Sequence, residues 1–159
     1  MKQSGVEAHL HICGSTDSLS ARQGYLEELH SLCEDLDVVN QVTFLGSISE
    51  LEVKQELEDA HFFCLASLKE PLGVAIMEGM AMETPAIVAR SPGVMEMIED
   101  GFDGILVEPR APEEFVEAIL HLIDNPETAS RIAKAGRQKV EEKFHSGISA
   151  SKIAQGLSL

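Results

Sequence analysis

The alternation of short apolar runs with longer segments of helical periodicity is the feature that most constrains the fold of this chain. The apolar runs predict strands at 9–13, 42–45, 61–65, 85–89 and 104–107. Helical spacing of apolar residues fills the intervals at 26–36, 49–59, 74–82 and 93–99, and two further helices extend to about position 143. Because strands that alternate with helices form βαβ units, the sequence predicts an α/β domain with a doubly wound parallel sheet.

The length of 159 residues predicts one domain. We expect it to span 1–145, with 146–159 forming a C-terminal helix or a loosely held tail. No apolar run approaches the roughly 20 residues that cross a bilayer. The N-terminus also lacks the apolar stretch of a signal peptide, so the sequence predicts no membrane span and a cytoplasmic location.

The formal net charge of −15 argues against a nucleic-acid partner. Nucleic acid would be repelled over most of such a surface, so we expect no nucleic-acid partner. An anionic small ligand remains compatible, because amides at a helix N-terminus bind phosphate without basic side chains. Cys13, Cys33 and Cys64 have no zinc-like spacing, which predicts reduced, mostly buried thiols and no metal site.

The loops that follow the strands are the expected place for a ligand, because doubly wound sheets bind at the carboxyl ends of their strands. In the most informative loop, Glu70 follows an apolar strand, Gly73 opens a helix and Glu78 lies within that helix. The amides of the first turn would donate to phosphate, and the two carboxylates would accept from hydroxyls. The alternatives are that Glu70 is a first-turn acid on the helix dipole and that Glu78 is a solvated helix residue.

The segment around these glutamates, A-S-L-K-E-P-L-G-V-A-I-M-E-G-M-A-M-E-T-P-A-I-V-A, resembles the signature of retaining glycosyltransferase family 4. That signature reads roughly P-S-x-x-E-G-F-G-x-x-x-x-E-A-M-A-x-G-x-P-V-V-A. The likeness continues in V-T-F-L-G at 42–46, P-G-V-M-E at 92–96 and D-G-F-D-G-I-L-V at 100–107. In all it covers about positions 9 to 144.

This resemblance implies the Rossmann-like, C-terminal domain of the GT-B fold, which binds a UDP-, GDP- or ADP-sugar for retaining glycosyl transfer without a metal or other cofactor. Glu70 would act at the catalytic centre by contacting hydroxyls of the donor sugar, and Glu78 would hold the ribose hydroxyls. The resemblance assigns further donor contacts to the amides around Leu72, Gly73 and Val74, and to loops beside the base and ribose at Gly14, Leu45, Gly46 and Ser47.

Some positions depart from the family pattern. Glu83 stands where the family has a glycine, so we expect another helix ending there and an unfavourable charge on the negative end of the dipole. Pro92 and Met95 replace a glycine and a proline of the G-G-x-P-E motif, so the backbone near the sugar is expected to differ.

The resemblance also implies parts that this sequence does not contain. These are the first βα unit, with an arginine and a lysine that neutralise the diphosphate, and the N-terminal acceptor domain. The nearest basic candidates, Arg22, Lys69 and Arg90, are predicted to be ordinary surface charges. We therefore expect the chain to need a missing domain or a partner chain for activity.

Two other functions stay open. The chain could be a non-catalytic binding or assembly module, or a split subunit, that pairs through an open sheet edge. It could also be another enzyme with the GT-B fold, such as a sugar-nucleotide epimerase.

Overall fold

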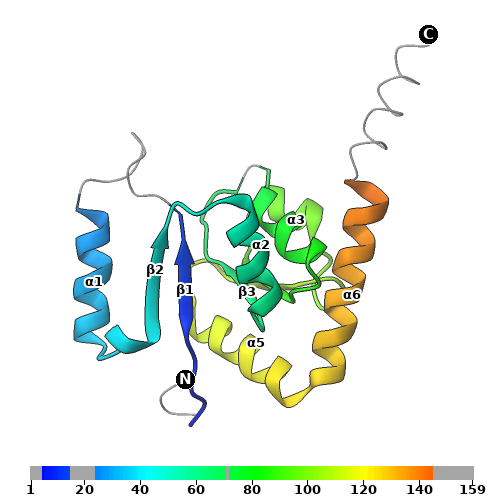
Figure 1. Ribbon diagram of the computed structural model, residues 1–159. Helices are drawn as coiled ribbons and strands as arrows, with labels where there is room; N and C mark the ends of the chain where they lie inside the picture. The colour runs from blue at the N-terminus through cyan, green and yellow to red at the C-terminus, as the bar shows by residue number, and fades with distance from the viewer. Residues whose placement is uncertain (1–4, 15–23, 71, 145–159) are drawn as a thin grey trace. The chain divides into compact units, whose positions relative to one another are not determined.

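The computed structural model describes residues 5–14, 24–70 and 72–144 (Figure 1). The chain divides into two compact units, residues 1–53 and 54–159, and each is described by itself. The predicted tail at 146–159 lies outside the described residues, as does Arg22.

The first unit is a small parallel βα arrangement. It contains β1 (Leu10–Cys13), α1 (Tyr25–Asp35), a 3-10 turn η2 (Val39–Gln41) and β2 (Val42–Gly46). Strands β1 and β2 pair in parallel, with a register shift that sets Cys13 opposite Gly46. Among the described residues of this unit none is buried, although both predicted strands are confirmed.

Helix α2 (Glu50–Asp59) runs across the boundary between the units. Ser49 followed three residues later by Glu52 predicts a capping box at its start, and the structure has one. The Ser49 amide and hydroxyl donate to Oε2 of Glu52 at 2.8 and 2.7 Å, and the Glu52 amide donates back to the Ser49 hydroxyl at 3.3 Å. These two bonds from Ser49, the hydroxyl's first, hold the pKa of the Glu52 carboxyl below its usual range. The box therefore satisfies orphan donors of the first turn, as its sequence predicted.

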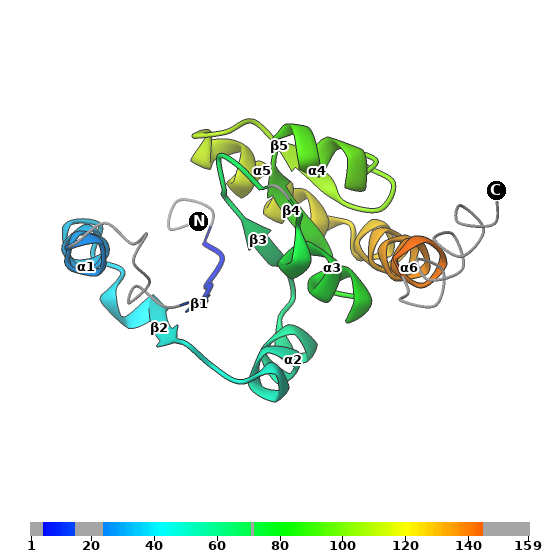
Figure 2. The same ribbon diagram turned by 90° about the horizontal axis from the view of Figure 1, so that it is seen from above.

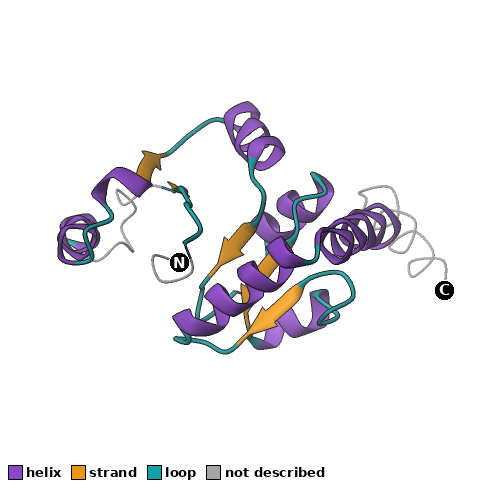
Figure 3. Cartoon of the chain, turned by 90° about the horizontal axis from the view of Figure 1, so that it is seen from below, coloured by secondary structure: helices purple, strands orange, loops and turns teal. Residues whose placement is uncertain are grey.

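The second unit carries a three-stranded parallel sheet. Figure 2 shows β4 (Ala86–Ala89) between β3 (Phe63–Leu65) and β5 (Ile105–Val107). The helices of this unit, shown in purple in Figure 3, are α3 (Val74–Ala81), α4 (Pro92–Met97), α5 (Pro112–Asp124) and α6 (Pro126–Lys143). The predicted parallel α/β architecture is confirmed.

Strand β4 is buried on both faces, which places the core on either side of it. Ala86 and Val88 pack with side chains of α3 and α4, including Ile76 and Val94. Ile87 points the other way and packs with side chains of α5 and α6, among them Leu122 and Ile132. Because alternate residues of a strand face opposite sides, the continuous apolar run 86–89 fits a central strand covered by helices on both faces.

The sequence Asn125-Pro126 predicts a helix start, and α6 indeed has Asn125 as its N-cap residue and Pro126 as its first residue. The Asn125 side chain makes no cap bond, because its Nδ2 atom donates to the His121 carbonyl oxygen at 2.8 Å. One local prediction was wrong. The thiols were expected to be mostly buried, yet Cys13 and Cys64 are exposed and Cys33 is half-buried. The apolar character of the runs 9–13 and 61–65 favoured buried cysteines, whereas β1 and β3 leave these two side chains accessible.

Candidate functional site

The loop after β3 leads directly into α3, as the sequence predicted, and Glu70 folds over the start of that helix. Its Oε1 atom accepts from the Gly73 amide at 2.8 Å and from the Leu72 amide at 3.4 Å. In this structure Glu70 therefore occupies two of the amides that the sequence assigns to phosphate. A carboxylate at a helix N-terminus is favoured by the helix dipole, so Glu70 occupies the position an anion would take.

The turn at Gly73 favours glycine, first because of its backbone conformation and second because of close packing. Its φ of +63° lies in the left-handed region, which side chains disfavour. In addition, a Cβ built on Gly73 would lie 2.5 Å from Sδ of Met97 and 3.2 Å from Cδ1 of Ile76. A larger residue at this position would therefore displace the ends of the Met97 and Ile76 side chains.

The remaining predicted residues of this segment lie on its exposed side. Val74 and Glu78 are separated by one helical turn and therefore share a face of α3, and both are exposed. Leu72 is exposed as well. Within the described residues, no hydrogen bond or ion pair involves the Glu78 carboxylate, so its oxygens are available to accept from hydroxyl groups.

In the first unit the structure brings the two predicted glycine loops together. The Gly14 amide donates to the Gly46 carbonyl oxygen at 2.8 Å, at the carboxyl ends of β1 and β2. Both glycines have positive φ, and a Cβ built on either would meet no atom of the described residues within 4 Å. Leu45 is half-buried and Ser47 exposed. These residues lie at strand ends, where doubly wound folds bind ligands.

Among the basic candidates, Arg90 has a structural role. Its Nη2 atom lies 2.6 Å from Oδ2 of Asp100, and its Nε atom lies 3.1 Å from Oε1 of Glu108. These two carboxylates neutralise the guanidinium beside β5. Lys69 is exposed, and its ammonium forms no hydrogen bond or ion pair with a described residue.

The expectation of another helix ending at Glu83 was wrong. Glu83 has φ +56°, the conformation that a glycine would adopt there. Its amide donates to Met80 and the Thr84 amide donates to Gly79, which is the Schellman pattern. Its carboxylate lies 3.8 Å from Nε of Arg137, a cation that offsets the unfavourable charge at the helix end.

The other two departures from the family pattern, Pro92 and Met95, both lie on α4. Pro92 is the first residue of α4, where its fixed φ fits and its missing donor costs nothing. Met95 lies exposed on the same short helix. Neither residue makes a contact in the described structure that would require a glycine or a proline.

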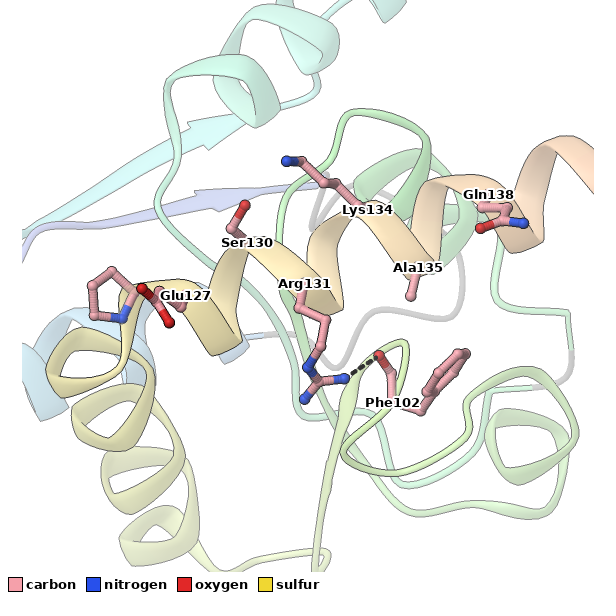
Figure 4. Close-up of a pocket in the computed structure, with 8 residues that line it drawn as sticks. Phe102, Glu127, Ser130, Arg131, Lys134, Ala135 and Gln138 are labelled. Atoms are coloured by element: carbon pink, nitrogen blue, oxygen red, sulfur yellow. Dashed lines mark hydrogen bonds between the residues drawn. The ribbon is translucent and has the colours of Figure 1, made fainter.

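A separate shallow groove lies between α6 and the loop before β5 (Figure 4). Arg131 reaches from α6 to the loop, where it donates to the Phe102 carbonyl oxygen at 3.5 Å (dashed line in Figure 4) and to the Gly101 carbonyl oxygen at 3.1 Å. The side chain of Lys134 points away from this loop. None of the residues predicted to bind a donor lines this groove. It is therefore distinct from the N-terminus of α3.

Two further observations concern the described residues only. None of their helices is both long and apolar enough to cross a bilayer. No three His, Cys, Asp or Glu side chains among them are grouped so that they could hold a metal ion.

The sequence pattern of the family described as "Glycosyl transferases group 1" matches residues 1–139. The human alpha-1,3/1,6-mannosyltransferase ALG2 is 31% identical over 143 residues, which are 89% of this chain and 34% of the human protein. An uncharacterized glycosyltransferase of Methanocaldococcus jannaschii, MJ1607, is 31% identical over 137 residues, covering 86% of this chain and 33% of that protein. The chain thus spans about a third of the length of these relatives.

Solved structures show the same architecture. Anabaena Alr3699/HepE in complex with UDP superposes with a TM-score of 0.87 and 28% identity, over 95% of this chain and 41% of that one. The C-terminal domain of the group 1 glycosyl transferase LpcC from Francisella tularensis matches in fold, with a TM-score of 0.72 and 18% identity, over 90% of both chains. The fold is therefore that of GT-B C-terminal domains, and the chain belongs to the group 1 glycosyl transferase family.

Proposed function

We propose that this chain is the donor-binding domain of a retaining glycosyltransferase and that it binds a nucleotide-sugar at the N-terminus of α3. The observation that carries the proposal is the arrangement of Glu70 on the Leu72 and Gly73 amides, with the Glu78 carboxylate exposed on the same helix. Two acceptors beside two amide donors suit a ligand that carries both hydroxyls and phosphate. The complexes of Alr3699/HepE with UDP and with UDP-glucose support a ligand of this class.

Binding exchanges one set of hydrogen bonds for another. A phosphate or sugar oxygen accepts from the amides of Leu72 and Gly73 and displaces the Glu70 carboxylate, which then accepts from a sugar hydroxyl. Glu78 accepts from the ribose hydroxyls. Hydrogen bonds to a charged group are the stronger kind, so both glutamates contribute substantially to affinity.

The reaction is transfer of the sugar with retention at the anomeric carbon. The bond from that carbon to the diphosphate oxygen breaks, a bond to the acceptor hydroxyl oxygen forms on the same face, and the hydroxyl proton leaves with the diphosphate. The acceptor is held by residues beyond this sequence, a proposal consistent with relatives about three times as long. The domain alone is expected to bind donor without transferring sugar.

The test is a calorimetric titration of the chain with UDP, GDP, ADP and their glucose and mannose conjugates. One nucleotide should bind saturably. Glu78→Ala should weaken it about 10- to 100-fold, the loss expected for hydrogen bonds to a charged group. Glu117→Ala, which removes an exposed glutamate of α5, serves as the matched control and should bind as the parent does. A folded chain that binds none of these ligands would refute the proposal.

A second variant separates the roles of the two glutamates. Glu70→Ala removes the acceptor for the sugar but leaves the ribose contact, so it should weaken the sugar conjugate more than the free nucleotide. Equal losses for both ligands would contradict the assignment of Glu70 to the sugar.

An assembly function is the second candidate, favoured by the position of β3. In the described sheet this strand hydrogen-bonds to β4 alone, which leaves one edge without a partner strand. A chain that binds no nucleotide yet dimerises at micromolar concentration in sedimentation velocity would favour this function, whereas a monomeric nucleotide binder would exclude it.

A further inference from the structure

Lys139 and Asp103 form a largely buried ion pair between α6 and the loop that precedes β5. The Asp103 side chain is fully buried and that of Lys139 is 14% exposed. The Lys139 ammonium contacts Oδ2 of Asp103 and also donates to the Met97 carbonyl oxygen at 2.9 Å. Oδ1 of Asp103 accepts from the Glu99 amide at 2.8 Å. Helix α6 thereby fixes both the last residue of α4 and the turn that follows it.

The close approach of α6 to this turn depends on a glycine at position 136. A Cβ built on Gly136 of α6 would lie 3.1 Å from the Asp103 carbonyl oxygen. A larger residue would push the helix outward and lengthen the Lys139 contacts. The pair is therefore set at a defined distance by packing as well as by charge.

Met97, whose carbonyl oxygen accepts from Lys139, also packs against the N-terminus of α3 through its side chain. Its thioether packs on Gly73 so closely that a Cβ there would lie 2.5 Å from Sδ and 3.0 Å from Cε. Gly73 in turn donates to Glu70. A continuous series of contacts inside one unit thus runs from Lys139 through Met97 and Gly73 to Glu70.

We propose that Lys139 is a positioning residue for the donor site at the N-terminus of α3 and that it acts with Asp103 through Met97 and Gly73. The expected effect on ligand affinity rests on the proposed function. The expected effect on the position of the Gly73 amide does not depend on any ligand. Without the Lys139 ammonium, the end of α4 loses its cation, Met97 shifts on Gly73, and the amides that meet the donor lose their fixed geometry.

The same helix offers a matched control. Arg137 donates from Nη1 to the Ala81 carbonyl oxygen at 3.0 Å and so holds the opposite end of α3. It is exposed, and its guanidinium contacts Ala81, Glu83 and Glu141, all of which lie away from the Met97 and Gly73 contact. Loss of Arg137 should lower stability without disturbing the N-terminus of α3.

The test uses the full chain with Lys139→Met, Arg137→Met and the doubly neutral Asp103→Asn/Lys139→Met. Hydrogen exchange of the Gly73 amide is followed by NMR, and UDP-glucose affinity is followed by calorimetry. Lys139→Met should speed exchange at Gly73 and weaken UDP-glucose binding by about 3- to 30-fold. Arg137→Met should leave both quantities within about twofold, the size of effect expected for an uncoupled site.

The doubly neutral variant covers the case in which Lys139→Met fails to fold, because replacing both charges avoids a lone buried carboxylate. It should fold and show the same loss at Gly73. Unchanged Gly73 exchange in a folded variant, or an equal change in Arg137→Met, would overturn the positioning role. If the parent binds no UDP-glucose but Gly73 exchange responds as expected, UDP-glucose is not the ligand of this site. The role of Lys139 in positioning the Gly73 amide would still be supported.

Discussion

The two units contain the same kinds of element but differ in what they bury. In the described part of the first unit, paired strands and an amphipathic helix leave no residue buried, and Leu32 of α1 is 51% exposed. In the second unit, helices on both faces of β4 enclose two apolar clusters. Strand pairing alone therefore does not make a core, because most of the stability of a helix or strand comes from burying its apolar face.

The difference predicts a large contrast in hydrogen exchange. Amides of β1 and β2 should exchange faster than those of β4 by a factor on the order of 100 or more, because few buried contacts oppose local opening of the first unit. Native-state exchange of the intact chain, measured by NMR or mass spectrometry, tests this contrast. Comparable protection in β2 and β4 would show that the first unit is held by contacts beyond those it makes itself.

A matched pair of leucine substitutions sharpens the comparison at the level of side chains. Leu122→Ala on α5 removes a side chain that is 1% exposed, and it should lower the free energy of unfolding by about 2–5 kcal/mol. Leu32→Ala makes the same chemical change on α1 and should cost about 0.5 kcal/mol. Urea unfolding followed by circular dichroism measures the cost of Leu122→Ala, and hydrogen exchange of α1 amides measures that of Leu32→Ala. Similar costs for the two variants would mean that α1 packs against a partner surface.

The capping box at the boundary of the units should give an intermediate effect. Ser49→Ala removes the hydroxyl that caps α2 and should destabilise the chain by about 1 kcal/mol in urea unfolding at neutral pH. The folded-state pKa of Glu52 is lowered, so its contribution is present above the unfolded pKa and is lost as the pH falls through the folded value.

The Ser49→Ala deficit should therefore shrink in acid. A deficit that stays constant from neutral pH to pH 3 would show that the Ser49–Glu52 bonds do not contribute to stability.

The smallest effects are expected at two equivalent helix ends, one in each unit. Asp37 follows α1 and Glu83 follows α3, both with positive φ and the same Schellman bonding. Glu83→Gly should raise the unfolding free energy by a few tenths to about 1 kcal/mol, since the left-handed strain exceeds the added chain entropy. Asp37→Gly should gain less, because aspartate tolerates this conformation better.

The readouts of this pair should also differ. The gain at Glu83 should appear in the urea midpoint, whereas that at Asp37 should appear only as slower exchange of α1 amides. A shift of the midpoint in Asp37→Gly would indicate that the two units unfold together.

Much of the fold could be predicted from sequence because its signals are local. The apolar run 86–89 and the capping box at Ser49 predicted the buried strand and the helix start that the structure has. The carboxylate segment around Glu70 was also located correctly at a strand end. What could not be predicted depends on contacts between distant residues or on a side-chain conformation.

The site illustrates this limit. Nothing in the sequence pairs Met97 with Gly73, or Lys139 with Asp103, because these contacts arise only when α4 and α6 pack beside α3. The occupation of the Leu72 and Gly73 amides by Glu70 depends on one rotamer. Both alternatives for Glu70 considered from sequence remain compatible, since a helix-capping acid can also exchange its amides for a ligand.

The burial of β4 on both faces has a consequence for how the chain is made. The apolar run Ala86–Ala89 emerges from the ribosome before α5 and α6, the helices that cover one of its faces. Until Ile132 has left the exit tunnel, the Ile87 side chain remains partly exposed to water. The nascent chain therefore passes through a stage in which one apolar face of β4 is exposed and prone to aggregation.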